Sequence, residues 1–257
     1  MTILRRWRFT AVQLRTLWES AGRDVLPYPL RHWYAEQYRE DSLRLRRVAA
    51  GEVHRQLDED LVHAMTVLLE PEARIEVAGF RGARNEVPIR AHAAAHYQHG
   101  VLAIQHPGPE PDQGGDVDFL FLSSDALPAA VIDVLPECAP GQGDPLSIPV
   151  TELEKPPPVV RDAWRTTPRE DFDRFFNRPT TSTTHVAVYP FGSIDNRHIK
   201  GRKDFQVTDF ADDGRYVSFG SRTMIAKPTD RRRLTATVAE MLTRTVTEVR
   251  DGDHVPH

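Results

Sequence analysis

The stretch VPIRAHAAAHYQ, residues 87 to 98, alternates between two kinds of side chain. The odd positions from Ile89 to Tyr97 are apolar or small, and most even positions are polar, namely Arg90, His92, His96 and Gln98. Successive side chains of a β-strand point to opposite faces of the sheet. The alternation therefore predicts an antiparallel strand with one face on a core and the other toward water or a partner.

Shorter apolar runs on both sides of this stretch predict further strands. In the first part of the chain they lie at 75–79, 101–104 and 117–122, with a Pro/Gly-rich loop at 107–115. In the second part they lie at 185–189, 204–210, 215–219 and 222–226. Asp212-Asp213-Gly214 is a turn signal between two of these runs.

Helix signals flank each group of predicted strands. Thr10 followed by Gln13 resembles a capping box for a helix that stops near Gly22. Asp58 can cap the second of one or two helices predicted over 43–69. The other predicted helices follow Ser124-Asp125, lie around 159–176, and follow Thr229-Asp230. Residues 25–30 contain two prolines and predict a packed connector after the first helix.

The two parts of the chain therefore repeat one plan of helix, antiparallel strands, cap and helix. We predict an α+β fold, a quasi-two-fold duplicated α/β unit with a central antiparallel sheet flanked by helical bundles. Residues 1–138 form the N-terminal half and residues 159–257 the C-terminal half of one domain. Residues 139–158, which end in Pro156-Pro157-Pro158, form a Pro-rich connector between them.

Composition argues against several classes of protein. The 33 Lys and Arg residues against 37 Asp and Glu give a net charge of -4, which does not favour a general nucleic-acid binder. No run approaches the roughly 18 to 20 apolar residues of a membrane span, so we expect no membrane insertion. The single Cys138 cannot form an internal disulfide, and the first six residues lack the apolar stretch of a signal peptide. We therefore expect a cytoplasmic protein.

The histidines of the central stretch are the best candidates for a metal site. They are His92, His96 and His99, with Glu86 shortly before them. On one strand face, however, His92 and His96 would lie about 13 Å apart, which is too far to share one ion. A second group, His54, Asp58, Asp60 and His63, has helical spacing and fits the wet face of a helix. We expect no bound metal.

Motifs for catalysis or for a cofactor are also missing from the sequence. Cys138 lies in a predicted loop without a motif that would bring a histidine to it. Neither a phosphate-binding glycine motif nor a G-x-S-x-G elbow occurs. We expect no catalytic residue and no cofactor, so the sequence favours a binding role.

Four stretches in order, from residue 9 to residue 230, resemble the EspG family of ESX (type VII) secretion-associated proteins. They are FTAVQLRTLW at 9–18, LPYPL at 26–30, DFADDGRY at 209–216 and AKPTD at 226–230. The resemblance covers almost the whole chain. It implies a quasi-two-fold α/β fold with a central antiparallel sheet and helical bundles, in agreement with the duplication.

The resemblance also implies a function. EspG proteins are cytosolic chaperones that bind the PPE member of a PE–PPE heterodimer at the tip of its helical bundle and keep it soluble for its ESX system. The expected partner is thus a PE–PPE-like or other helical ESX substrate, bound by a monomer or weak homodimer. A non-catalytic adaptor for another helical partner, such as a WXG100-type protein, is the alternative. An enzyme with an unrecognised site is a third possibility.

In the family the contact surface includes the loop after the second strand, the open sheet face and the C-terminal helical region. Carried over to this chain, the resemblance and the predicted sheet face select these candidate partner-binding residues: Phe80, Arg81, Arg84, Asn85, Glu86, Arg90, His92, His96 and Arg231. Phe80 is the expected apolar anchor, with Arg81 and Arg84 as rim charges. Arg231 lies on the first turn of the last predicted helix, where a cation is mildly unfavourable. It is either simply solvated or placed to meet an acidic partner.

Overall fold

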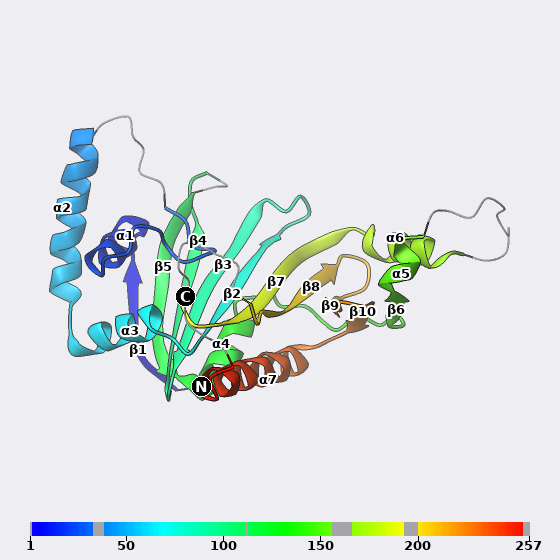
Figure 1. Cartoon of the computed structure of the whole chain (residues 1–257). Coiled ribbons are helices and arrows are strands. Elements are labelled where there is room, and N and C mark those ends of the chain that lie inside the picture. Colours follow the sequence, from blue (N-terminus) through cyan, green and yellow to red (C-terminus); the bar gives the residue numbers. More distant parts are fainter. Residues whose placement is uncertain (1, 33–38, 111–112, 156–165, 193–199, 254–257) are drawn as a thin grey trace.

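A single antiparallel sheet organises the computed structural model of this chain, which describes residues 2–32, 39–110, 113–155, 166–192 and 200–253 (Figure 1). Within these residues the sheet has ten strands in the order β1-β5-β4-β3-β2-β7-β8-β9-β10-β6. Their bounds are β1 Ile3–Phe9, β2 Ala73–Arg81, β3 Val87–His96, β4 His99–Pro107, β5 Gly114–Ser123, β6 Leu146–Pro149, β7 Thr180–Pro190, β8 Lys203–Phe210, β9 Arg215–Phe219 and β10 Thr223–Pro228. The helices are α1 Ala11–Ser20, α2 Arg39–Gln56, α3 Glu59–Leu69, α4 Leu127–Ile132, α5 Val150–Leu153, α6 Pro168–Phe176 and α7 Arg231–Arg250, with a 3-10 turn, η1, at Ser124–Ala126.

The strand order repeats on the two sides of the sheet centre. Outward from the central β2–β7 pair, one side reads β2, β3, β4, β5, β1 and the other reads β7, β8, β9, β10, β6. In chain order a helix follows the last strand of each half, α4 after β5 and α7 after β10. The fold is therefore a mixed α/β fold with a large antiparallel sheet, as predicted, and its topology is duplicated.

Local signals placed several helix ends correctly. The Thr10 hydroxyl accepts the Gln13 backbone N–H, and the Gln13 side chain accepts the Thr10 N–H, which completes the capping box of α1. Asp58 caps α3 through the Leu61 N–H, and Asp230 caps α7 through the Arg233 N–H. Such caps depend on a few neighbouring residues, so the sequence is enough to find them.

Both edge strands differ from the prediction. Strand β1 was not predicted because arginines interrupt its apolar residues, and only its last part, Trp7 and Phe9, is buried. Strand β6 and helix α5 lie inside the range 139–158 that was predicted to be an extended connector. Strand β6 has four residues, of which only Ile148 is buried, so its pattern is too short to recognise. In the predicted helical stretch 159–176, residues 159–165 lie outside the described residues, and α6 begins at Pro168.

Different helices cover the two faces of the sheet. Helices α4 and α7 pack on one face, where Leu234, Val238 and Leu242 of α7 join a core with Ile75 and Val77. On the other face, α1 and α3 cover β3, β4 and β5 with a second core that includes Leu14, Leu61 and Phe119. Helix α2 packs on α1 (Figure 1). Strands β3, β4 and β5 thus have packed side chains on both faces.

Replacing Phe119 tests the second core. Phe119 has no exposed surface and contacts the rings of Trp7 and Phe9. We expect Phe119→Ala to lower the free energy of unfolding by about 3–5 kcal/mol, measured by urea denaturation. Phe80→Ala, at a side chain that is 48% exposed, is the matched control and should cost less than ~1 kcal/mol. Equal losses in the two variants would contradict this description of the core.

Candidate partner-binding surface

The loop between β2 and β3 is held by its own backbone. Gly82 and Asn85 both adopt positive φ angles, of 96° and 54°, and the Asn85 N–H donates to the Gly82 carbonyl at 3.0 Å. The Arg84 N–H donates to the Glu86 carboxylate at 2.9 Å. Backbone N–H groups of Glu86 and Arg84 lower the pKa of the Glu86 carboxyl. The Gly82 N–H donates to the carbonyl of Thr181, near the start of β7, at 2.8 Å, so the loop has a defined conformation.

Five of the candidate residues come together at this loop and the end of β2, in the segment from Gly79 to Glu86 that is called the loop from here on. Phe80 is paired between Pro88 of β3 and Thr183 of β7, and its side chain remains half exposed. Arg81, Arg84, Asn85 and Glu86 follow it and are exposed. An exposed aromatic side chain close in sequence to exposed arginines, on an ordered loop, has a composition that is common in protein-binding surfaces.

Arg90 and His92 do not lie on an open face, and this prediction is wrong. His92 is 1% exposed, and its Nδ1–H donates to the Tyr28 carbonyl at 2.7 Å. Arg90 is also buried, and its Nη1 donates to the Gln113 carbonyl at 2.8 Å. Alternation correctly placed both side chains on one face, but segments distant in the sequence cover that face. These residues anchor the connector after α1 and the end of the β4–β5 loop to the sheet.

Burial makes His92 a neutral histidine. Desolvation lowers its pKa to about 4, the hydrogen bond to the Tyr28 carbonyl opposes this shift, and the charge of Arg74 adds to it. Glu76 lies directly opposite in the register of β2 and β3. The donor geometry at Nδ1 fits a neutral ring with its proton on that nitrogen.

His96 lies far from the loop. It ends β3, ten residues after the loop, which corresponds to about 33 Å along the strand. Its ring contacts Tyr97, and His99, its partner in the β3–β4 pairing, contacts the ring of His63. Desolvation, followed by the charges of His63 and His96, lowers the pKa of His99. Within the described residues no group of three or more potential ligands could hold a metal ion.

Arg231 lies on the opposite side of the sheet. Helix α7 covers the face that carries Ile75 and Val77, whereas the side chain of Phe80 is on the alternate face of β2. Arg231 forms an ion pair with Asp133, at the C-terminal cap of α4. An acidic group of the chain itself therefore offsets the unfavourable position of this cation. The structure does not bring Arg231 to the same surface as the loop.

A polar sheet face that sequence reasoning missed lies next to the loop. Thr183, His185, Asp204 and Gln206, on β7 and β8, are partly exposed or exposed. Thr183 pairs with Phe80, and His185 pairs with Ala78 and Gln206, so this face continues directly from the loop. The His185 Nε2 lies 2.7 Å from the Asp204 carboxylate. Alternation of His185 with Val186 and Val188 was the signal that could have identified it.

Comparison with known proteins agrees with this architecture. The model of the EspG family matches residues 10–240. The chain belongs to the EspG family. Its fold is similar to the Mycobacterium tuberculosis type VII secretion system chaperone EspG5, solved in complex with the PE25-PPE41 dimer, with a TM-score of 0.55. That likeness has 13% sequence identity and covers 95% of this chain and 96% of the other, so it shows the fold alone.

Two other comparisons add nothing to the argument. A putative adenylate cyclase from Bacillus halodurans is 11% identical, covering 78% of this chain and 89% of the other, and its TM-score of 0.17 is too low for any inference. No curated protein sequence matches the chain.

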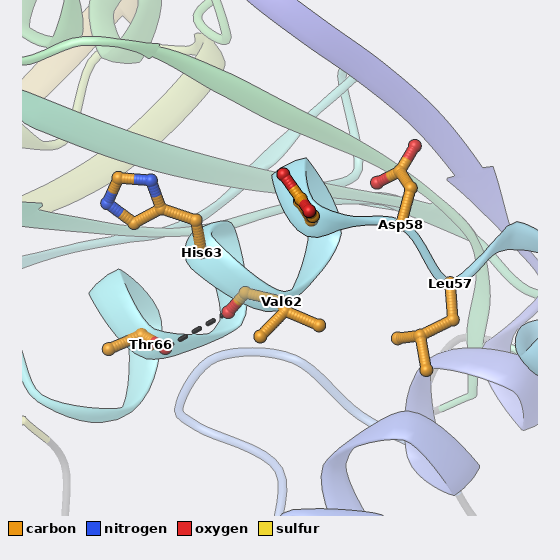
Figure 2. A pocket seen from close by; sticks show the side chains of 6 residues that line it. Leu57, Asp58, Val62, His63 and Thr66 are labelled. Atoms are coloured by element: carbon orange, nitrogen blue, oxygen red, sulfur yellow. Dashed lines mark hydrogen bonds between the residues drawn. The ribbon is translucent and has the colours of Figure 1, made fainter.

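A separate hollow on α3 of this EspG chain is lined in part by polar residues, of which two, Asp58 and Thr66, are used in structural hydrogen bonds. It has a volume of about 610 Å³ and is lined by Leu57, Asp58, Glu59, Val62, His63 and Thr66 (Figure 2). Asp58 is used as the cap of α3 and is bonded to Arg5, and the Thr66 hydroxyl donates to the Val62 carbonyl. Within the described residues no helix is long and apolar enough to cross a membrane.

The buried His92 predicts a pH-dependent stability. Because its folded pKa of about 4 lies below the ordinary value of 6.5, the unfolded chain binds more protons between these values. The stability from this site should be complete above pH ~6.5 and be lost toward pH ~4, by roughly 2–4 kcal/mol. In His92→Asn the side-chain amide can donate to Tyr28 from the position of Nδ1 but does not titrate, so urea denaturation across this range should show a shallower pH dependence. Identical slopes in both proteins would contradict the assignment.

Proposed function

We propose that this chain is a cytosolic chaperone that binds the PPE member of a PE–PPE-like heterodimer at the tip of its helical bundle. It keeps the substrate soluble for delivery to a type VII (ESX) secretion system. The observation that carries the proposal is membership of the EspG family over residues 10–240. The whole-chain fold likeness to EspG5, which was solved with PE25-PPE41, supports it.

The proposed contact centres on the loop from Gly79 to Glu86. Phe80 supplies the apolar anchor, and its half-exposed ring can become buried against the apolar tip of a helical bundle. Arg81 and Arg84 contribute mainly to orientation and to the rate of association, because they stay at the wet rim. Asn85 has a positive φ and Glu86 is bonded to the loop backbone, so the loop is already ordered before it binds.

The polar face of β7 and β8 is proposed as the extension of this contact. It begins beside Phe80 at Thr183 and continues through His185. Arg90 and His92 support the sheet from inside and make no direct contact in this proposal. His96 and Arg231 are left out of the contact because one lies at the far end of β3 and the other on the opposite side of the sheet.

Binding without turnover is enough for this role. A chaperone that binds the folded or assembly-ready substrate shifts its equilibrium by mass action. Arg81, Arg84 and Glu86 of the loop are exposed, and the hollow on α3 is lined by none of them, so the described loop does not enclose a reacting group. We infer that the protein is not an enzyme.

The first test identifies the partner. Affinity purification of the tagged chain from its host, followed by mass spectrometry, should recover a PE–PPE-like pair in a one-to-one complex with the chaperone. Recovery of a WXG100-type hairpin in its place would favour the adaptor function. Substrate turnover by the purified chain would contradict a purely binding role.

The second test locates the contact by co-expression of the recovered partner with variants. Phe80→Ala should weaken binding by about 2 kcal/mol, or roughly thirtyfold in Kd, and leave little soluble substrate on the chaperone. Arg84→Glu should slow association and make it less dependent on salt. Val62→Ala, at an equally exposed apolar residue on α3, and Arg47→Glu, at an exposed arginine on α2, are the matched controls. Full recovery by Phe80→Ala and Arg84→Glu would place the contact elsewhere.

A further inference from the structure

Asp213, in the turn between β8 and β9, joins three segments of the chain. Its carboxylate accepts the Gln142 backbone N–H at 2.6 Å, the Tyr216 hydroxyl at 2.6 Å and the Arg178 Nη1 at 3.1 Å. The Tyr216 oxygen in turn accepts the Gly143 N–H at 2.8 Å. The hydrogen bond from Tyr216, followed by those from Gln142 and Arg178, lowers the pKa of the Asp213 carboxyl. The β8–β9 turn therefore also attaches the 142–143 loop and the end of α6 to the sheet.

Arg178 completes this arrangement from the end of α6. Its guanidinium lies 3.7 Å from the ring centre of Phe210, 4.7 Å from that of Phe175 and 5.4 Å from that of Tyr216. Its Nε donates to the Phe175 carbonyl at 3.1 Å. A planar guanidinium held between aromatic rings and a carboxylate has little freedom, so the α6–β7 junction is fixed against the β8–β9 hairpin.

This junction leads directly to the candidate loop. The Ala211 N–H donates to the Pro179 carbonyl at 2.9 Å, and the Thr181 hydroxyl donates to the Asp209 carbonyl at 3.3 Å. The register of β7 against β8 shifts between Thr180 and Ser182, so Thr181 lies in a bulge. Its carbonyl is the group that accepts the Gly82 N–H of the loop.

A chain of contacts thus runs from Asp213 to the loop without passing through the hydrophobic core. Asp213 binds Arg178, the carbonyl of the next residue, Pro179, accepts the Ala211 N–H just before β7, and the Thr181 carbonyl accepts the Gly82 N–H. Residues 79–81 are paired with β3 and β7, whereas Gly82 has a left-handed φ and its N–H is bonded to the Thr181 carbonyl. The conformation of the turn at 82–86 therefore depends in part on the position of Thr181.

We propose that Asp213 and Arg178 are positioning residues for the partner-binding loop, which they hold in its binding conformation through the Thr181 bulge. This role rests on the proposed function of the loop. Neither residue touches the partner. Without the pair the loop would sample more conformations, and binding would have to order it again.

Hydrogen exchange of the free protein tests the positioning without any partner. We expect Arg178→Ala and Asp213→Asn to raise the exchange rate of the peptide that spans residues 79–86 by about tenfold, because its bond to Thr181 opens more often. Arg250→Ala is the matched control. It removes the ion pair with Glu72, which lies just before β2 and so about 30 Å along that strand from Gly82. This control should leave exchange in the 79–86 peptide unchanged.

The outcomes separate a positioning role from a general loss of stability. Asp213→Asn keeps the size of the side chain, so it decides the question if Arg178→Ala does not fold. Unchanged exchange of the 79–86 peptide in folded Asp213→Asn would overturn the proposal. Equal acceleration in Arg250→Ala, or in all peptides of the sheet, would overturn it as well.

Co-purification with the partner then distinguishes this proposal from the proposed function. Faster loop exchange together with about tenfold weaker partner binding supports both. Faster loop exchange with wild-type binding keeps the positioning role but contradicts the role of the loop in binding, and Phe80→Ala should then bind normally too. If the 79–86 peptide exchanged as slowly in Arg178→Lys as in the wild type, a positive charge alone would be sufficient. That result would overturn the role assigned to the stacked guanidinium.

Discussion

The antiparallel pairing of β2 with β7 joins the two halves of this molecule. It runs without a register shift from Ala73 opposite Pro190 to Arg81 opposite Ser182. The two backbones are close enough at Gly79 that a Cβ there would lie 2.3 Å from the Thr183 carbonyl oxygen, so a glycine is required. At the other end, buried Arg74 pairs with Glu76 and donates to the carbonyls of Pro190, Phe191 and Gly192. A buried guanidinium is tolerated only with such partners, so these bonds also specify where β7 ends.

The duplicated topology produces two unlike surfaces on either side of that pairing. On the first half, α1 and α3 cover the face that carries His92, and the second core forms there. On the second half, the helices in the corresponding chain positions, α5 and α6, contact β6 at the sheet edge (Figure 1). The polar face of β7 and β8 therefore keeps partly exposed side chains such as His185. On this face the first half therefore carries a packed core, whereas the second half exposes a polar surface beside the β2–β3 loop.

Buried polar groups in this protein connect segments that are distant in the sequence. His92 holds the Tyr28 carbonyl, Arg215 binds the Asp209 carboxylate through two nitrogens and the Pro136 carbonyl through one, and Asp213 joins the 142–143 loop to α6. Each bond satisfies a group that would be costly to bury alone. Together they attach the irregular segments to the sheet.

The sequence by itself determined the features that arise from neighbouring residues. The capping box at Thr10 and Gln13, the cap at Asp230 and the alternation from Ile89 to Tyr97 depend on local geometry, so they predicted α1, α7 and β3 and the antiparallel character of the sheet. The tertiary structure decided which side of each strand is covered. A period of two separates the faces of β3 but contains no information on the connector that covers Arg90 and His92. The tertiary structure also placed His96 and Arg231 away from the loop. The distance of His96 depends on the length of β3, and the place of Arg231 depends on the side of the sheet against which α7 packs.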